Sequence, residues 1–177
     1  GVFNPEKLLA LNAEHIRNSP EEKLAPHLLP FLTEKGIHAE AGPFLYAVIA
    51  TLKPRSKTLV EMADGAEFYF KTPDGYEEKG AKKFFKPELI DPLTRLADAL
   101  AEAEAFDENA LEPIFKQVMA DTGLGFGKLA QPLRLAVTGK TVSPGIFEML
   151  EVLGREETVS RLRQAIGHID SGAAPER

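Results

Sequence analysis

Residues 127–153 read Gly-Lys-Leu-Ala-Gln-Pro-Leu-Arg-Leu-Ala-Val-Thr-Gly-Lys-Thr-Val-Ser-Pro-Gly-Ile-Phe-Glu-Met-Leu-Glu-Val-Leu, and their pattern is that of two short helices. The apolar run Leu129–Val137 predicts the first helix, which contains Arg134. Before the second helix, Ser143-Pro144 offers a capping hydroxyl and a proline suited to the first helical position. Within that helix, apolar residues follow the spacing i, i+3, i+4 and i+7: Ile146, Met149, Leu150 and Leu153.

The same spacing recurs on both sides of this stretch. It is found at Leu45, Val48, Ile49 and Leu52, at Leu93, Leu96, Ala97 and Leu100, and at Val159, Leu162, Ile166 and Ile169. Capping sequences predict four helix starts, at Ser19-Pro20-Glu21-Glu22, Thr58-Leu59-Val60-Glu61, Asp91-Pro92 and Asp107. Two glycines, Gly36 and Gly123, predict helix ends. These signals predict an all-α chain with no sizeable sheet.

One segment fits two structures. Residues 68–76, with Pro73-Asp74-Gly75 at their centre, could form a β-hairpin. We interpret them as a helix end followed by a turn, because the surrounding sequence is helical. Prolines and charges between Lys71 and Lys86 indicate a junction between two small helical bundles. We expect bundles over residues 19–86 and 87–170, preceded by a separate segment at 1–18 and followed by a disordered tail at 171–177.

The charge of the chain does not by itself indicate a nucleic-acid-binding protein. The formal net charge is −6, whereas such modules are usually basic. Eight acids and one base lie between residues 88 and 112, but Lys53, Arg55 and Lys57 form a local basic cluster. An acidic protein can bind RNA through such basic faces alone, although charge alone favours an ordinary solvated surface. The apolar runs are too short to cross a membrane.

The sequence contains none of the motifs that we associate with an independent enzyme. It has no cysteine, no phosphate-binding loop and no paired histidines with the spacing of a metal site. The glycine-rich stretch Gly123-Leu-Gly-Phe-Gly127 lacks the preceding strand that a dinucleotide site requires, so a helix end and a turn explain it better. We therefore expect no catalytic residue, no metal site and no cofactor in this chain.

The stretch quoted first resembles the hallmark of bacterial-type glutamyl-tRNA synthetases. The resemblance lies in Gln131-Pro132-Leu133-Arg134, Thr138-Gly139, Ser143-Pro144-Gly145-Ile146-Phe147 and Leu153-Gly154-Arg155-Glu156. Weaker similarity extends to Lys53–Glu61 and, near the start of the chain, to Phe3–Leu8, Leu11-Asn12 and His15-Ile16-Arg17. Between these last matches, Ala10 departs from the tryptophan common in the family. The resemblance implies the C-terminal anticodon-binding domain, an α-helical cage-like fold, with residues 1–18 as a remnant of the segment that joins the catalytic half.

The resemblance also implies which residues lie near the anticodon. They are Lys116, Arg134, Ser143, Pro144, Ile146 and Phe147. The position that inspects the third anticodon base falls within residues 53–57, where Arg55 is the preferred candidate and Lys57 is included in the expected site. Arg134 could present a planar fork to a base or phosphate, or form an ion pair. Ser143-Pro144-Gly145 could offer backbone N–H groups at a helix start, or only cap it. Phe147 could stack on an unpaired base or pack against a neighbouring helix.

The expected function is recognition of the anticodon loop of tRNA-Glu. The family's HIGH-like and KMSKS-like signatures do not occur in this chain, so the catalytic domain that attaches glutamate with ATP and Mg²⁺ lies outside it. The expected partners are tRNA-Glu and, covalently, that catalytic domain, in a monomeric cytoplasmic enzyme that contacts no membrane. The main alternative is a helical scaffold that binds proteins through its acidic face, without RNA. A small stand-alone enzyme is the weakest alternative.

Overall fold

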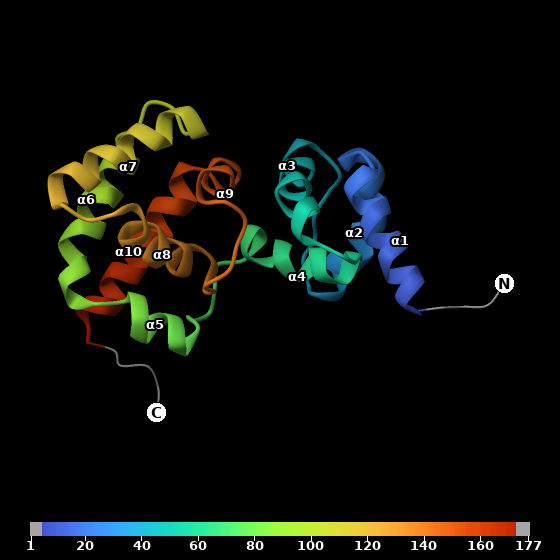
Figure 1. Ribbon diagram of the computed structural model, residues 1–177, viewed down its shortest axis with the longest axis horizontal. Helices are drawn as coiled ribbons and strands as arrows, with labels where there is room; N and C mark the ends of the chain where they lie inside the picture. Colours follow the sequence, from blue (N-terminus) through green and yellow to red (C-terminus); the bar gives the residue numbers. More distant parts are fainter. Residues whose placement is uncertain (1–4, 173–177) are drawn as a thin grey trace. The chain divides into compact units, whose positions relative to one another are not determined.

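The computed structural model describes residues 5–172, and side chains from Asn12 onward. Ten α-helices and two short 3-10 helices make up this part of the chain, and it contains no strand (Figure 1). The expected all-α fold is confirmed, and residues 68–76 do not form a hairpin, since a helix ends at Phe70 and a turn follows. The contacts divide the chain into two compact units, residues 1–71 and 72–177.

The first unit contains four α-helices and one 3-10 helix. They are α1 (Pro5–Asn18), α2 (Glu21–Glu34), α3 (Pro43–Leu52), η1 (Lys53–Arg55) and α4 (Leu59–Phe70). Helix α2 packs against both α3 and α4. The core of this unit consists of side chains that are almost fully buried: Ile16, Leu24, Leu28, Leu32, Ile37, Leu45, Val48, Ile49, Leu52, Met62 and Tyr69.

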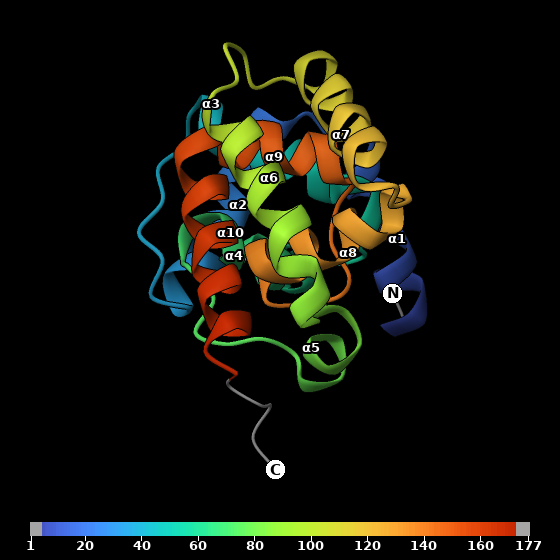
Figure 2. The ribbon, with the colours of Figure 1, turned by 90° about the vertical axis from the view of Figure 1, so that its left-hand side faces the viewer.

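The second unit contains the remaining helices. They are α5 (Glu78–Phe84), η2 (Pro87–Leu89), α6 (Ile90–Ala101), α7 (Glu108–Thr122), α8 (Phe126–Thr138), α9 (Ile146–Leu153) and α10 (Arg155–Asp170). Helix α10 runs beside α6 and also packs against α8 (Figure 2). The short helix α5 packs against α8. Residues 72–86 therefore belong to the second unit, so the division falls after Lys71 and not after Lys86, where the sequence suggested a boundary.

Two of the predicted helix starts and both predicted helix ends agree with the structure. Thr58 Oγ1 accepts a hydrogen bond from the Glu61 N–H, and the Glu61 carboxylate accepts one from the Lys57 N–H. Asp107 caps α7 in the same way, through the Ala110 N–H. Gly36 and Gly123 have φ values of +76° and +74°, the left-handed conformation that ends a helix and favours glycine.

At Ser19 and Asp91 the helices begin close to the predicted positions, at Glu21 and Ile90, but neither side chain caps its helix as predicted. Ser19 Oγ donates to the His15 carbonyl at the end of α1, and Pro20 takes the N-cap position of α2 without a side-chain cap. Helix α6 begins at Ile90, one residue before Asp91, because the 3-10 turn η2 leads directly into it. The expected tail at residues 171–177 lies mostly outside the described residues, as do residues 1–4 and the side chain of Ala10.

Candidate nucleic-acid interface

Arg134 lies on α8, a helix that is buried on most of its sides in the core of the second unit. Leu133, Leu135 and Val137 are fully buried there, whereas Arg134 is half-buried. Its Nε donates to Ser143 Oγ at 2.8 Å, and its Nη1 donates to Gln131 Oε1 at 2.7 Å. Both of these acceptors are neutral. The guanidinium is therefore oriented by these two hydrogen bonds, and the residue as a whole is partly exposed.

Ser143 is the partner of Arg134 and does not cap a helix. It is 9% exposed, accepts the bond from Arg134 and donates to the Pro144 carbonyl at 2.7 Å. Helix α9 consequently begins at Ile146, later than the Ser143-Pro144 sequence predicts. The Gly145 N–H donates to the Glu148 carboxylate at 3.0 Å. Because a negative charge already lies at this helix start, it is a poor site for a phosphate.

Phe147 belongs to a cluster of three aromatic rings. Its ring centroid lies 5.3 Å from that of Phe115 on α7 and 5.7 Å from that of Phe126 at the start of α8. Phe115 is buried, Phe147 is half-buried, and Phe126 is 39% exposed. Phe147 thus packs against neighbouring helices, one of the two alternatives that the sequence leaves open. The sequence analysis missed Phe126, which extends the cluster to the surface.

Val142 is a second residue that the sequence analysis missed. Its side chain is 70% exposed, although it directly precedes the buried Ser143. By contrast, the Pro144 side chain is buried and Ile146 is only 5% exposed. Pro144 and Ile146 can therefore shape this turn but offer little side-chain surface to a ligand. The accessible apolar surface comes from Val142 and Phe126.

Lys116 follows Phe115 on α7 and points to solvent. It pairs with Glu112, four residues earlier, at 3.3 Å, and both side chains are more than half exposed. A surface ion pair of this kind contributes about 0–1 kcal/mol, so Lys116 can exchange Glu112 for a phosphate at small cost.

Arg55 and Lys57 lie in the first unit, apart in the chain from the six residues above. Both are exposed, Arg55 at the end of η1 and Lys57 just before α4. The third member of this basic cluster has a structural role, because Lys53 Nζ donates to the Ser19 carbonyl at 2.7 Å and pairs with Glu21 at 3.4 Å. Within this cluster, the exposed basic side chains are therefore those of Arg55 and Lys57.

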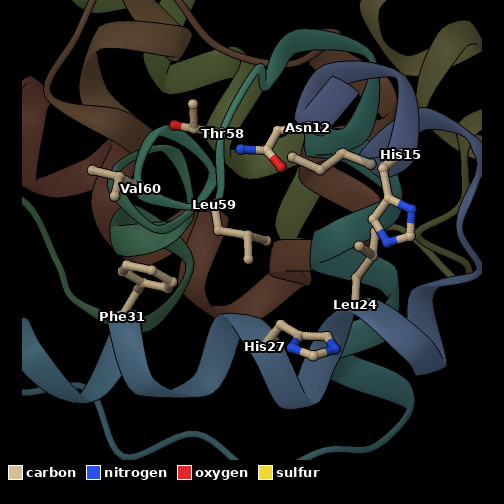
Figure 3. Close-up of a pocket in the computed structure, with 9 residues that line it drawn as sticks. Asn12, His15, Leu24, His27, Phe31, Thr58, Leu59 and Val60 are labelled. Carbon is tan, nitrogen blue, oxygen red and sulfur yellow. The ribbon is translucent and has the colours of Figure 1, made fainter. Parts of the chain in front are cut away.

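A mainly apolar pocket of about 320 Å³ lies beside the start of α4 in the same unit (Figure 3). His27 and Phe31 extend into it from α2 toward Leu59, and His15 and Asn12 border it from α1. The full lining is Asn12, His15, Ile16, Leu24, His27, Phe31, Thr58, Leu59 and Val60. Within the described residues, no group of three His, Asp or Glu side chains is placed to hold a metal ion. No described helix is both long enough and apolar enough to span a membrane.

In this all-helical fold Arg134 is oriented by two hydrogen bonds, and Phe126 and Val142 are exposed apolar side chains of the same unit. The chain belongs to a family of anticodon-binding proteins: the family model described as "Anticodon binding domain" matches residues 23–166, more than half of the chain. All eight residues expected to contact the anticodon fall within this range. Among individual proteins, the chain is similar to the glutamate–tRNA ligase of Desulfosudis oleivorans, with 52% identity over 94% of the chain.

A glutamate–tRNA ligase of Geotalea uraniireducens is 48% identical over 97% of the chain. The chain covers 36% and 37% of these two relatives, so it spans about a third of their length. A crystal structure of a glutamate tRNA ligase from Elizabethkingia meningosepticum, in complex with its amino acid, superposes with a TM-score of 0.85 at 26% identity. It covers 94% of this chain, which corresponds to 33% of the solved chain. The resemblance to glutamyl-tRNA synthetases is confirmed by these comparisons.

Proposed function

We propose that this chain recognises the anticodon loop of tRNA-Glu for a glutamate–tRNA ligase. The observation that supports this most directly is the orientation of the half-buried Arg134 by Ser143 and Gln131. A guanidinium oriented in this way can hydrogen-bond a base edge or stack on a base. Unpaired loop bases are the RNA elements that proteins usually recognise by sequence, since their edges and faces are accessible.

The proposal gives the residues of the second unit different roles. Arg134 contacts a base, while the exposed Phe126 offers a ring for stacking and the exposed Val142 offers apolar contact surface. Ser143 orients Arg134, and the buried Pro144 and Ile146 shape the turn around it. Phe147 packs against Phe126 and supports it, and Lys116 neutralises a phosphate.

In the first unit, Arg55 and Lys57 are the proposed contacts for the third anticodon base and its phosphate. They are exposed basic residues at the end of η1 and before α4. Both belong to the segment Lys53–Glu61, where the sequence is similar to the family.

The rest of the proposal concerns the whole ligase. In the ligase, a catalytic part outside this chain attaches glutamate to tRNA-Glu with ATP and Mg²⁺, and the present chain supplies no catalytic residue. We infer that the ligase is a monomeric cytoplasmic enzyme to which this chain is covalently joined. The relatives named as glutamate–tRNA ligases, at 48–52% identity, support this proposal.

The acidic face gives little support to the alternative of a protein-binding scaffold. Of the acids between residues 88 and 112, three already pair with basic side chains of the same unit: Asp91 with Arg95, Asp98 with Arg163, and Glu112 with Lys116. Such a face presents less uncompensated charge than its composition suggests.

Titration of the purified chain with tRNA-Glu tests the proposal. An otherwise identical transcript with a changed anticodon serves as the control. Each lost base contact should weaken binding by about 1–3 kcal/mol, which is roughly a fivefold to 150-fold change in Kd. Equal affinity for the two transcripts, or no binding of either, would contradict the proposal.

A further inference from the structure

Residues 72–77 lie against the turn that joins α8 to α9 in the second unit. The Glu77 N–H donates to the Gly139 carbonyl at 2.9 Å. The backbones approach so closely that a Cβ atom on Gly139 would lie 2.7 Å from the Gly75 carbonyl oxygen. The position of this turn is therefore defined by direct backbone contact with a segment more than sixty residues earlier in the chain.

The Glu77 side chain makes two further bonds to the same turn. Its Oε2 accepts from the Thr141 N–H at 3.2 Å and from Thr141 Oγ1 at 3.0 Å. Together with the backbone bond to Gly139, these bonds fix the turn at two points. Thr141 is two residues before Ser143, so Glu77 restrains the chain just before the group that orients Arg134.

The other end of this segment is linked to the last turn of α8. Thr72 Oγ1 donates to the Glu157 carboxylate at 3.3 Å, and that carboxylate also accepts from Arg161 Nε at 3.1 Å. Arg161, which is 3% exposed, donates from Nη1 to the Val137 carbonyl at 2.7 Å. Segment 72–77 thus contacts the end of α8 through one network and the following turn through another.

We propose that Glu77 is a positioning residue for RNA recognition, and this inference rests on the proposed function. By restraining Thr141, Glu77 keeps Ser143 where its hydroxyl accepts the bond from Arg134 Nε. Glu77 itself carries a negative charge and contacts no RNA in this proposal. Its loss should therefore weaken the anticodon-dependent part of binding, although removal of a negative charge by itself favours RNA binding.

The neighbouring Glu78 provides a matched control. It is equally acidic and exposed, but its carboxylate pairs with Lys82 on α5 at 3.1 Å and not with the turn. Glu77→Ala should weaken binding of tRNA-Glu about threefold to tenfold, as expected for the loss of hydrogen bonds to a charged acceptor at an exposed position. Glu78→Ala should leave affinity unchanged or slightly higher. Glu77→Gln, which keeps one acceptor oxygen, should give an intermediate affinity.

Two further measurements separate positioning from a general loss of structure. Melting temperatures of the two alanine variants should agree within about 3 °C, because both residues are on the surface. In an Arg134→Ala background, Glu77→Ala should have little further effect on tRNA affinity, since both changes act on the same contact.

The inference would be overturned by equal effects of Glu77→Ala and Glu78→Ala, or by a full additional loss in the Arg134→Ala background. An equal loss for tRNA with a changed anticodon would also overturn it. Failure of the proposed function is recognised separately, because the unsubstituted chain would then bind both transcripts alike or bind neither.

Discussion

Arg134 is the residue whose substitution tests the interface most directly. Its Nε and Nη1 donate to Ser143 and Gln131, so Arg134→Ala removes the guanidinium that these two bonds orient. We expect it to weaken tRNA-Glu binding by about 1–3 kcal/mol. The loss should shrink with a changed anticodon, because the contact is then already broken. Measuring tRNA affinity and melting temperature on the same variant tests this.

Arg95→Ala is the matched control, because it removes one positive charge from an exposed arginine that pairs with Asp91 on α6. It should change tRNA affinity much less than Arg134→Ala does. A large fall in melting temperature on Arg134→Ala, with unchanged tRNA affinity, would give Arg134 a structural role only.

At the residue scale, the sequence predicted the helix that contains Arg134 but not the partners of its side chain. Ser143 has the sequence of a helix cap, yet its hydroxyl bonds Arg134 nine residues earlier in the chain, a contact that only the folded turn creates. The burial of Ile146 agrees with its place in the apolar stripe of α9. Phe126 and Val142 were missed because an apolar residue in a single sequence is normally interpreted as core.

At the scale of the helix, the end of α8 depends on a glycine for two reasons. Gly139 has a φ of +76°, and a Cβ there would lie 2.7 Å from the Gly75 carbonyl oxygen. Gly123, at the end of α7, has a φ of +74°, but a Cβ there would meet no neighbouring atom within 4 Å. Comparison of an alanine substitution at each of the two positions therefore distinguishes the cost of the left-handed conformation from the cost of steric overlap.

Gly123→Ala should destabilise the chain by about 1 kcal/mol, the cost of the left-handed conformation. Gly139→Ala should cost about 2–4 kcal/mol, since overpacking against residues 72–77 adds to it. Denaturant unfolding of the two variants measures the difference. Equal losses of stability would mean that segment 72–77 moves aside without cost.

The helix starts show how far local sequence can determine local structure. The Thr58 and Asp107 caps formed as predicted, since each side-chain oxygen accepts a hydrogen bond from the backbone N–H three residues later. Ser19 and Ser143 have equally suitable sequences, but their hydroxyls donate to carbonyl groups nearby. The junction between the units was placed one helix too late for a similar reason. Residues 72–86 belong to the second unit because α5 packs on α8, and this packing cannot be deduced from the sequence.

At the scale of the whole molecule, the described chain has two separate hydrophobic cores. Leu28 on α2 belongs to the first and Leu133 on α8 to the second, and both side chains are fully buried. Leu→Ala at such positions typically costs about 2–5 kcal/mol. We expect Leu28→Ala to increase amide hydrogen exchange mainly in residues 12–71, and Leu133→Ala mainly in residues 72–172.

Hydrogen exchange followed by mass spectrometry, with peptides from both units, measures this directly. An equal loss of protection in both units on either substitution would show that the two cores unfold as one cooperative structure, in disagreement with the division of their contacts.

The carboxylate of Glu148 at the start of α9 affects how the binding of RNA should depend on ionic strength. Because it discourages a phosphate there, the base contacts proposed for the second unit come from Arg134 and from the neutral side chains of Val142 and Phe126. Few counterions are displaced when such groups bind, whereas Lys116, Arg55 and Lys57 displace them from phosphates. Added salt should thus lower the affinity for every tRNA while largely preserving the ratio between matched and changed anticodons. The molecule would remain selective in conditions where it binds weakly.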